Sequence, residues 1–261
     1  MSRIKLVVLD LDGTLLWPDH SLSAENAAAV RACRERGVEV TLASGRSFQA
    51  MRKYAEALAI TSPIIALNGG TTIEPQSGAI HVKAMLSPAQ VQHISAMLLE
   101  QEIPFVIFGV RAIYALPGMV DRNIMTSYDE PPITEVSDLR AIPDPLKVLS
   151  FLEASSRDAE LLPLVAGVTD QVRSGPLFLE WLPFNINKGS ALQDLMQERG
   201  LHPDEVLAIG DGQNDMSMLQ VAGISVAMGN APAEVSACAK YHTTRCEENG
   251  VAAALRRFVL G

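Results

Sequence analysis

The sequence predicts an α/β fold whose core is a parallel, doubly wound sheet, with a second, smaller α/β domain inserted into it. The first observation is a set of short, continuously apolar runs, which is typical of parallel strands buried on both faces. The second is that helical stretches with one apolar face separate these runs, as in a doubly wound sheet. The third is a break in this alternation in the middle of the 261-residue chain.

The core elements follow from apolar runs and from helix caps. The runs assigned to core strands are 4–9, 38–43, 64–67, 206–209 and 224–228. The stretches assigned to core helices are 24–36, 47–59 and 189–199. Ser23 is a suitable N-cap for the first helix, and Gly37 occupies the position after its end that favours glycine. These elements alternate along the chain and predict the parallel sheet.

The middle of the chain follows a different pattern. Residues 71–85 predict a hairpin around Gln76-Ser77-Gly78, and Ser87-Pro88-Ala89-Gln90 predicts a helix that begins with a capping box. Strand-like runs follow at 105–108, 112–116, 147–153 and 177–182, with a helix around 156–165. We therefore divide the chain into a core of residues 1–82 and 186–261 and an inserted α/β domain of residues 83–185.

Composition and charge exclude several classes of protein. With 48% hydrophobic and 20% charged residues, the chain has the composition of a folded globular protein. A net charge of −9 and the lack of basic runs longer than Arg256-Arg257 argue against nucleic acid and anionic membranes as partners. No apolar run approaches the ~18 residues of a membrane helix, and residues 1–5 do not resemble the start of a signal peptide. We expect a cytoplasmic protein, and the oligomeric state is not predicted.

Two carboxylates stand at the end of the first apolar run. Asp10 and Asp12 lie in Val8-Leu9-Asp10-Leu11-Asp12-Gly13-Thr14. At the end of a strand, side chains at i and i+2 share a face, so both carboxylates are expected to point into the same space. The crevice beyond the carboxyl ends of parallel strands is where ligands bind. The alternative interpretation is that Asp12-Gly13 only marks a turn.

Further polar motifs follow other strands at the same edge. After the second strand, Ser44-Gly45-Arg46 offers a hydroxyl and backbone N–H groups near a helix start, which can bind phosphoryl oxygens; an ordinary N-cap is the alternative. Asp211 and Asp215 follow the run at 206–209. Four aspartates in one crevice would repel one another, so they require a hard divalent cation, and oxygen ligands indicate Mg²⁺.

Lys188 stands at the start of a predicted helix, where the helix dipole disfavours a cation. A surface lysine at this position is common. Beside four aspartates, however, its charge can neutralise carboxylates and a transferred phosphoryl group.

Taken in chain order, the motif of Asp10 and Asp12, the motif of Ser44, Lys188, and the motif of Asp211 and Asp215 resemble the haloacid dehalogenase superfamily of phosphohydrolases, in its Cof-type branch. The branch pattern is also found in segments after other predicted strands and near the end of the chain: Asn68-Gly69-Gly70, Met218-Leu219, Ala227-Met228-Gly229-Asn230-Ala231 and Glu248-Asn249-Gly250-Val251-Ala252. The resemblance implies a Rossmann-like core, and it implies that the insertion at 83–185 is the α/β cap that selects the substrate.

The resemblance also implies roles for individual residues. Asp10 would be the nucleophile that forms an aspartyl-phosphate, and Asp12 would protonate the leaving oxygen and then activate water. The implied metal ligands are Asp10, the backbone carbonyl of Asp12, Asp211 and, as a ligand or a support, Asp215. The residues implied in catalysis or substrate binding are Ser44, Gly45, Arg46, Asn68, Gly69, Lys188 and Asn214.

The expected function is therefore a Mg²⁺-dependent phosphatase that hydrolyses a small phosphorylated metabolite, such as a sugar phosphate, through an aspartyl-phosphate. Two alternatives stay open. A phosphomutase would use the same intermediate to move a phosphoryl group, and a non-catalytic relative would only bind phosphate or Mg²⁺. The motifs do not identify the natural substrate.

Overall fold

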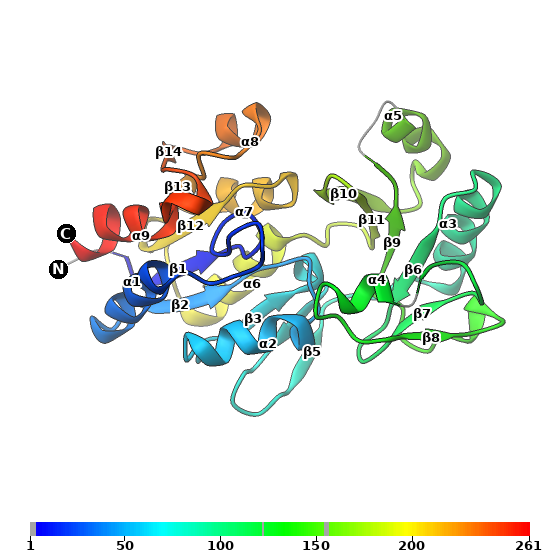
Figure 1. The fold of residues 1–261 in the computed structure, drawn as a ribbon, viewed down its shortest axis with the longest axis horizontal. Coiled ribbons are helices and arrows are strands. Elements are labelled where there is room, and N and C mark those ends of the chain that lie inside the picture. The colour runs from blue at the N-terminus through cyan, green and yellow to red at the C-terminus, as the bar shows by residue number, and fades with distance from the viewer. Residues whose placement is uncertain (1–3, 122, 154–156) are drawn as a thin grey trace. The chain divides into compact units, whose positions relative to one another are not determined.

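A computed structural model describes residues 4–121, 123–153 and 157–261 of the chain. Two compact units are present (Figure 1). Unit 1 comprises Met1–His81 and Asn187–Gly261, and unit 2 comprises Val82–Ile186. The division falls one residue from each boundary predicted from the sequence.

Unit 1 is built on a parallel sheet with the strand order β14-β13-β12-β1-β2. Its strands are β1 (Leu6–Leu9), β2 (Glu39–Leu42), β12 (Val206–Gly210), β13 (Ile224–Ala227) and β14 (Tyr241–His242). A parallel bridge between Ala43 and Ile65 places β3 (Ile64–Ala66) beyond β2. β3 also begins a three-stranded sheet with β4 (Thr71–Ile73) and β5 (Ile80–Val82), which includes the predicted hairpin.

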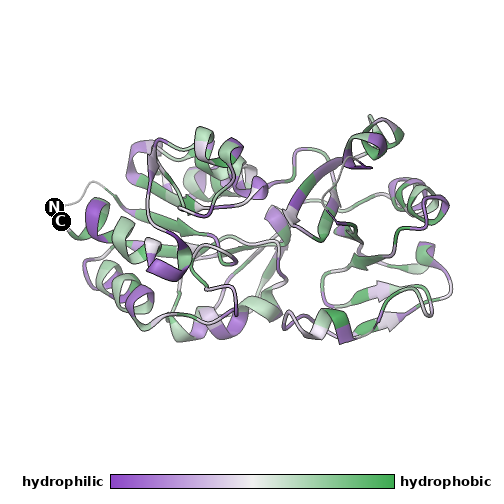
Figure 2. Ribbon diagram, turned by 45° about the horizontal axis from the view of Figure 1, so that its top comes forward, coloured by the Kyte–Doolittle hydropathy of each residue, from purple (hydrophilic) through white to green (hydrophobic). Residues whose placement is uncertain are grey.

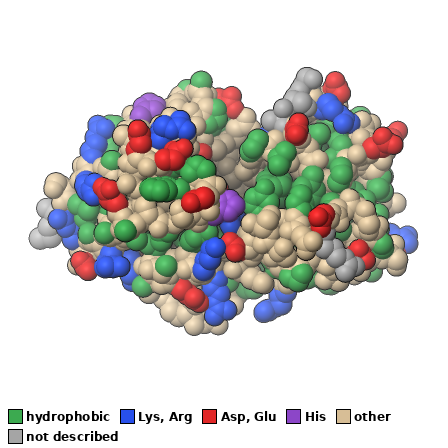
Figure 3. All heavy atoms as spheres, in the orientation of Figure 1, with side chains coloured by type: hydrophobic (Ala, Val, Ile, Leu, Met, Phe, Trp, Pro, Cys, Tyr) green, Lys and Arg blue, Asp and Glu red, His purple; other side chains and the backbone are tan. Residues whose placement is uncertain are grey.

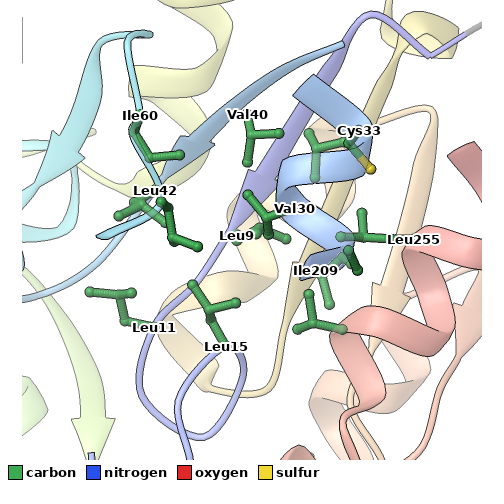
Figure 4. Close-up of a cluster of buried hydrophobic side chains, with 14 of the residues drawn as sticks. Leu9, Leu11, Leu15, Val30, Cys33, Val40, Leu42, Ile60, Ile209 and Leu255 are labelled. Carbon is green, nitrogen blue, oxygen red and sulfur yellow. The ribbon is translucent and has the colours of Figure 1, made fainter. Parts of the chain in front are cut away.

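Helices cover both faces of the parallel sheet, so the predicted doubly wound α/β fold is confirmed. The helices of unit 1 are α1 (Ala24–Glu35), α2 (Phe48–Ala57), α6 (Lys188–Arg199), α7 (Met216–Val221), α8 (Ala233–Cys238) and α9 (Gly250–Leu255). Val7 and Leu9 of β1 belong to the hydrophobic cluster that contains α1, α2 and α9 (Figure 4). Leu6 and Val8 belong to the cluster that contains α6, α7 and α8. Because alternate side chains are buried on opposite faces, the whole strand is apolar.

Polar caps fix where the helices of unit 1 begin. The Ser23 hydroxyl accepts a hydrogen bond from the N–H of Asn26 at the start of α1, and Gly37 follows the helix with a positive φ of 78°. Asn187 caps α6 through the N–H of Ser190. The contacts of Ser23 and Gly37 are the capping pattern that the sequence predicts, and the Asn187 cap is an addition from the structure.

Unit 2 contains a mainly antiparallel sheet with the strand order β10-β11-β9-β6-β7-β8, in which only β7 and β8 pair in parallel. Its strands are β6 (Phe105–Phe108), β7 (Ile113–Ala115), β8 (Ile133–Glu135), β9 (Lys147–Phe151), β10 (Asp170–Gly175) and β11 (Phe178–Leu182). Its helices are α3 (Pro88–Glu100), α4 (Asn123–Thr126) and α5 (Arg157–Leu161). The predicted capping box of Ser87 and Gln90 opens α3. The helix expected at 156–165 is α5 followed by a 3-10 turn at Leu162–Val165, and Ser156 lies outside the described residues.

Hydropathy follows this architecture in both units. Figure 2 shows hydrophobic colouring along the central strands and alternating colouring along the helices. None of the helices in the described residues is both long and apolar enough to cross a bilayer.

On the face drawn in Figure 3, acidic and basic side chains are interspersed over each unit. The cytoplasmic location stays a prediction.

Candidate active site

The polar motifs of unit 1 meet where β1 and β12 end. These strands are parallel neighbours with Leu9 opposite Ile209, so the residues that follow them leave the sheet side by side. Asp10 follows β1 directly, and Asp211 follows the last residue of β12. The carboxyl edge of the sheet thereby collects side chains that are about 200 residues apart in the sequence.

Lys188 is the buried cation of this cluster. Its ammonium donates hydrogen bonds to Asp10 Oδ1 at 2.7 Å and to Asp215 Oδ1 at 2.6 Å, and the lysine side chain is 0% exposed. Lys188 is the first residue of α6, directly after the cap Asn187. The two carboxylates account for a cation at a helix end that would otherwise disfavour it.

Asp215 and Asp211 are held in place by further donors. The second oxygen of Asp215 accepts the backbone N–H groups of Asp211 and Gly212, both at 2.9 Å. One oxygen of Asp211 accepts the Thr14 hydroxyl and the other accepts the Asn230 amide, again at 2.9 Å each. Asp211 is therefore oriented from two loops before any ligand binds.

Thr14 and Asn230 were assigned no role in the sequence analysis. The Asn230 amide also donates to the Gly13 carbonyl at 2.8 Å and thus connects the loop after β1 with Asp211. Both residues lie inside quoted motifs, which was the available signal. The contacts themselves could not be predicted, since Thr14 and Asp211 are 197 positions apart.

The electrostatics of the cluster are dominated by burial and by like charges. Burial, followed by the charge of Asp215, raises the pKa of Asp10 well above its usual value, although Lys188 acts in the opposite direction. Burial and Asp215 also raise the pKa of Asp211 to about 7 against the stabilising bond from Thr14. Burial alone would lower the pKa of Lys188, but its two carboxylate partners outweigh it and raise that pKa. One lysine therefore does not balance the carboxylates around it.

These carboxylates fit a divalent cation. Asp10, Asp211 and Asp215 each offer one oxygen, and these three oxygens lie within 4.8 Å of one another. Carboxylate oxygens are the ligands of hard cations such as Mg²⁺. A bound cation would also offset the excess of negative charge that raises the pKa of Asp10 and Asp211.

The Asp12 carboxylate lies outside this group of three and has a different partner. It is 43% exposed and accepts hydrogen bonds from Arg46 Nε at 2.7 Å and from the terminal nitrogen Nη2 at 2.6 Å. The strand geometry that would place Asp10 and Asp12 on one face ends at Leu9, and the chain turns at Leu11. The two aspartates still lie close enough for the charge of Asp12 to raise the pKa of Asp10.

In the segment after β2, two backbone N–H groups that could have bound phosphoryl oxygens form hydrogen bonds within the protein. The Ser44 N–H donates to the Ile65 carbonyl at 3.0 Å, and the Arg46 N–H donates to the Ser44 hydroxyl oxygen at 3.2 Å, so these two N–H groups are engaged within the protein. The Ser44 hydroxyl is buried and keeps its own proton to donate. Gly45 lies between them and is partly buried. At Ser44, the hydroxyl is therefore the group that can donate to a phosphoryl oxygen.

The segment after β3 lies against the start of α6. Gly69 has a φ of 93°, and an added Cβ would lie 2.3 Å from the carbonyl oxygen of Asn187, so glycine is required for this close approach. The buried Asn68 accepts a hydrogen bond from the Asn214 amide at 3.0 Å. Gly69 thus helps to place Lys188, and Asn68 and Asn214 form one unit.

Comparison with known proteins agrees with this geometry. Residues 7–255 match the family model of haloacid dehalogenase-like hydrolases. The chain belongs to this family. It is 30% identical to 5-amino-6-(5-phospho-D-ribitylamino)uracil phosphatase YcsE of Bacillus subtilis, over 98% of this chain and 96% of that protein. It is also 30% identical to an HMP-PP phosphatase of Citrobacter koseri, over 87% of this chain and 85% of that protein.

A solved structure extends the likeness to the whole fold. A haloacid dehalogenase-like hydrolase from Bacteroides thetaiotaomicron superimposes with a TM-score of 0.83 and 31% identity, over 97% of this chain and 99% of that one. The predicted superfamily is confirmed by these matches. The enzyme class is that of a phosphoric monoester hydrolase of the haloacid dehalogenase type.

Proposed function

We propose that this hydrolase is a Mg²⁺-dependent phosphatase that cleaves a small phosphorylated metabolite through an aspartyl-phosphate on Asp10. The observation that carries the proposal is the buried bridge from Asp10 through Lys188 to Asp215, next to Asp211. Such a carboxylate is fixed in orientation, shielded from bulk water and adjacent to positive charge. These are the conditions under which a carboxylate acts as a nucleophile on phosphorus.

The reaction would proceed in two displacements. An oxygen of Asp10 forms a bond to phosphorus while the bond from phosphorus to the leaving oxygen breaks, and Asp12 gives its proton to that oxygen. Water then attacks the same phosphorus and loses a proton to Asp12, and the bond between phosphorus and Asp10 breaks. Phosphate and the two original carboxyl groups result. Asp12 is suited to the proton transfers because its carboxylate is partly exposed.

Lys188 and the metal would share the charge of the phosphoryl group. Asp10, Asp211 and the backbone carbonyl of Asp12 would hold Mg²⁺, with Asp215 as a further ligand or a support. When bound, the cation supplies electrostatic stabilisation of the phosphoryl oxygens. Lys188 keeps a fixed positive charge beside Asp10, and the Ser44 hydroxyl would donate to a phosphoryl oxygen.

The printed name of a relative supports the proposed substrate class. One is named for a phosphoribitylamino-uracil, which is a small phosphorylated metabolite. For this chain we propose a phosphate ester of that size, such as a sugar phosphate. Gly45, Asn68, Gly69 and Asn214 would line its phosphate end, and unit 2 would act as the cap that selects the leaving group.

A panel of phosphorylated metabolites tests the function directly. We expect phosphate release with Mg²⁺ and none with EDTA. The affinity of Asp211→Asn for Mg²⁺ should be at least about tenfold lower than that of the wild type, because the variant loses a charged ligand. Isomerised product that requires a bisphosphate activator would indicate a mutase instead. Phosphate binding without turnover of any compound would favour the non-catalytic alternative.

A further inference from the structure

Arg46 belongs to a polar cluster around the Asp12 carboxylate. The cluster consists of Asp12, His20, Arg46 and Tyr54. Nε and Nη2 of Arg46 each donate to a different oxygen of Asp12, at 2.7 and 2.6 Å. This two-point contact fixes both the position and the plane of the carboxylate, which a single hydrogen bond would not.

The arginine itself has little freedom. Its side chain is 6% exposed, its N–H donates to the Ser44 hydroxyl oxygen, and its carbonyl accepts the N–H of Leu67 at 3.0 Å. The guanidinium carbon lies 6.0 Å from the centre of the Tyr54 ring. The backbone hydrogen bonds of Arg46, after β2, and the Tyr54 side chain of α2 thus both restrict where the guanidinium group points.

A second residue near the carboxylate, His20, is linked to α2. The Tyr54 hydroxyl donates to the His20 carbonyl at 2.9 Å, and His20 Nε2 lies 3.9 Å from Asp12 Oδ1. The loop that carries Asp12 is therefore connected to α2 through the Tyr54 hydroxyl. An arginine with only a packing role would not need a buried fork directed at one partly exposed carboxylate.

We propose that Arg46 is a positioning residue for Asp12 and acts on the reaction through that carboxylate, without binding the substrate phosphate. The inference rests on the proposed function, in which Asp12 transfers the proton to the leaving oxygen. The guanidinium keeps its own protons in this process, since arginine is not deprotonated in proteins. Its contribution is to hold the acid in line with the oxygen that leaves, and misplacement of about 1 Å is costly in such geometry.

Two probes of similar size separate this role from phosphate binding. The leaving group of 4-nitrophenyl phosphate needs little help from an acid, whereas the alkoxide of benzyl phosphate needs a proton as it departs. The ratio kcat/KM reports only the steps up to release of this group. We expect Arg46→Gln to lower kcat/KM for benzyl phosphate by about 10- to 100-fold, part of the 10²–10⁴ contributed by a general acid. For 4-nitrophenyl phosphate the change should stay below about threefold, with unchanged inhibition by inorganic phosphate.

The double variant adds a measurement that a structural effect would not reproduce. Asp12→Asn should show the same leaving-group dependence, and Asp12→Asn with Arg46→Gln should be no slower on benzyl phosphate than Asp12→Asn alone. Arg52→Gln, which removes an exposed arginine of the helix α2 that follows Arg46, is the matched control and should match the wild type on both probes. Thermal unfolding of every variant checks the fold, and Arg46→Lys replaces Arg46→Gln if the latter unfolds.

The outcomes distinguish the inference from the proposed function. Equal losses on both probes, with weaker inhibition by inorganic phosphate, would make Arg46 a phosphate ligand and overturn the inference while the phosphatase stands. Additive losses in the double variant would also overturn it. Lack of turnover by the wild type on either probe with Mg²⁺ would instead remove the proposed function.

Discussion

Each unit of the molecule buries a lysine against carboxylate, and the charge around the two lysines differs. In unit 2, Lys147 donates to Glu180 at 2.6 Å, both side chains are 1% exposed, and the ammonium lies 4.5 Å from the centre of the Phe108 ring. In unit 1, Lys188 is shared by Asp10 and Asp215, with Asp211 beside them. The first lysine forms a buried pair with Glu180, whereas three carboxylates surround the second and leave negative charge in excess.

This difference separates a structural pair from a functional one. A balanced buried pair is expected to hold its strands in register, because removing either partner leaves an unpaired charge. An unbalanced cluster is costly for the folded chain unless a cation binds, and such costs are typical of active sites. The comparison predicts that substitutions at Lys147 change stability and that substitutions around Lys188 change chemistry.

The largest effect is expected at the nucleophile. Asp10→Asn keeps the shape of the side chain but removes the carboxylate that we propose as the nucleophile, so turnover of 4-nitrophenyl phosphate should fall on the order of 10⁴-fold or more. Phosphate release under saturating Mg²⁺ measures the loss, and circular dichroism checks the fold. A folded Asp10→Asn protein with wild-type turnover would remove Asp10 from this role.

The next effect concerns Lys188. Lys188→Met should lower kcat by roughly 10²–10³-fold, as is usual when a fixed charge that stabilises the transition state is lost. Calorimetric titration should show that Mg²⁺ still binds, since the carboxylate ligands remain. Loss of Mg²⁺ binding together with activity would mean that Lys188 mainly organises the metal ligands.

The matched substitution in unit 2 should act on stability. Lys147→Met leaves Glu180 buried without its ammonium partner and should cost about 3–5 kcal/mol of unfolding free energy. The double variant Lys147→Met with Glu180→Leu should recover most of that loss, since it removes both charges of this pair. Urea unfolding measures both changes, and a double variant as unstable as the single one would contradict the balanced-pair interpretation.

A smaller effect is the pH dependence of the metal-free protein. Asp211 has a pKa of about 7 when folded against 3.8 in the unfolded chain, and the pKa of Asp10 is also raised. Between these values the folded state retains a proton that the unfolded state has lost, so stability in EDTA should fall as pH rises from about 4 to 7, by a few kcal/mol. Saturating Mg²⁺ should remove the fall. Urea unfolding of Asp211→Asn is the control, and a fall of equal size there would contradict the assignment.

The fold could be predicted where burial alone determines sequence. Strands covered on two faces, such as β1, read as unbroken apolar runs, and the capped helices carry local signals. The edge strands β8 and β10 were missed because Ile133–Glu135 and Asp170–Gly175 are short or polar, which is normal where one side lacks a neighbouring strand. Edge pairing depends on the rest of the sheet and not on the segment itself.

The candidate site could be predicted in part, where the topology of the sheet determines which residues meet. Asp10, Asp211 and Asp215 come together because the parallel strands β1 and β12 end side by side, and Lys188 reaches them from the first position of α6. The hydrogen-bond partner of the Asp12 carboxylate could not be predicted, since the contact with Arg46 depends on where β1 ends and is not visible in the spacing. Contacts such as Asn230 with Asp211 arise between loops and have no local pattern.

Trapping the intermediate tests the central claim most directly. Asp12→Asn should form the aspartyl-phosphate from 4-nitrophenyl phosphate, whose departure needs little acid, but should hydrolyse it slowly because the base for water is absent. Acid quenching followed by peptide mapping with mass spectrometry should place the phosphoryl group on the peptide that contains Asp10, and on none in Asp10→Asn. A phosphoryl group on another residue, or continued phosphate release without any adduct, would contradict the account.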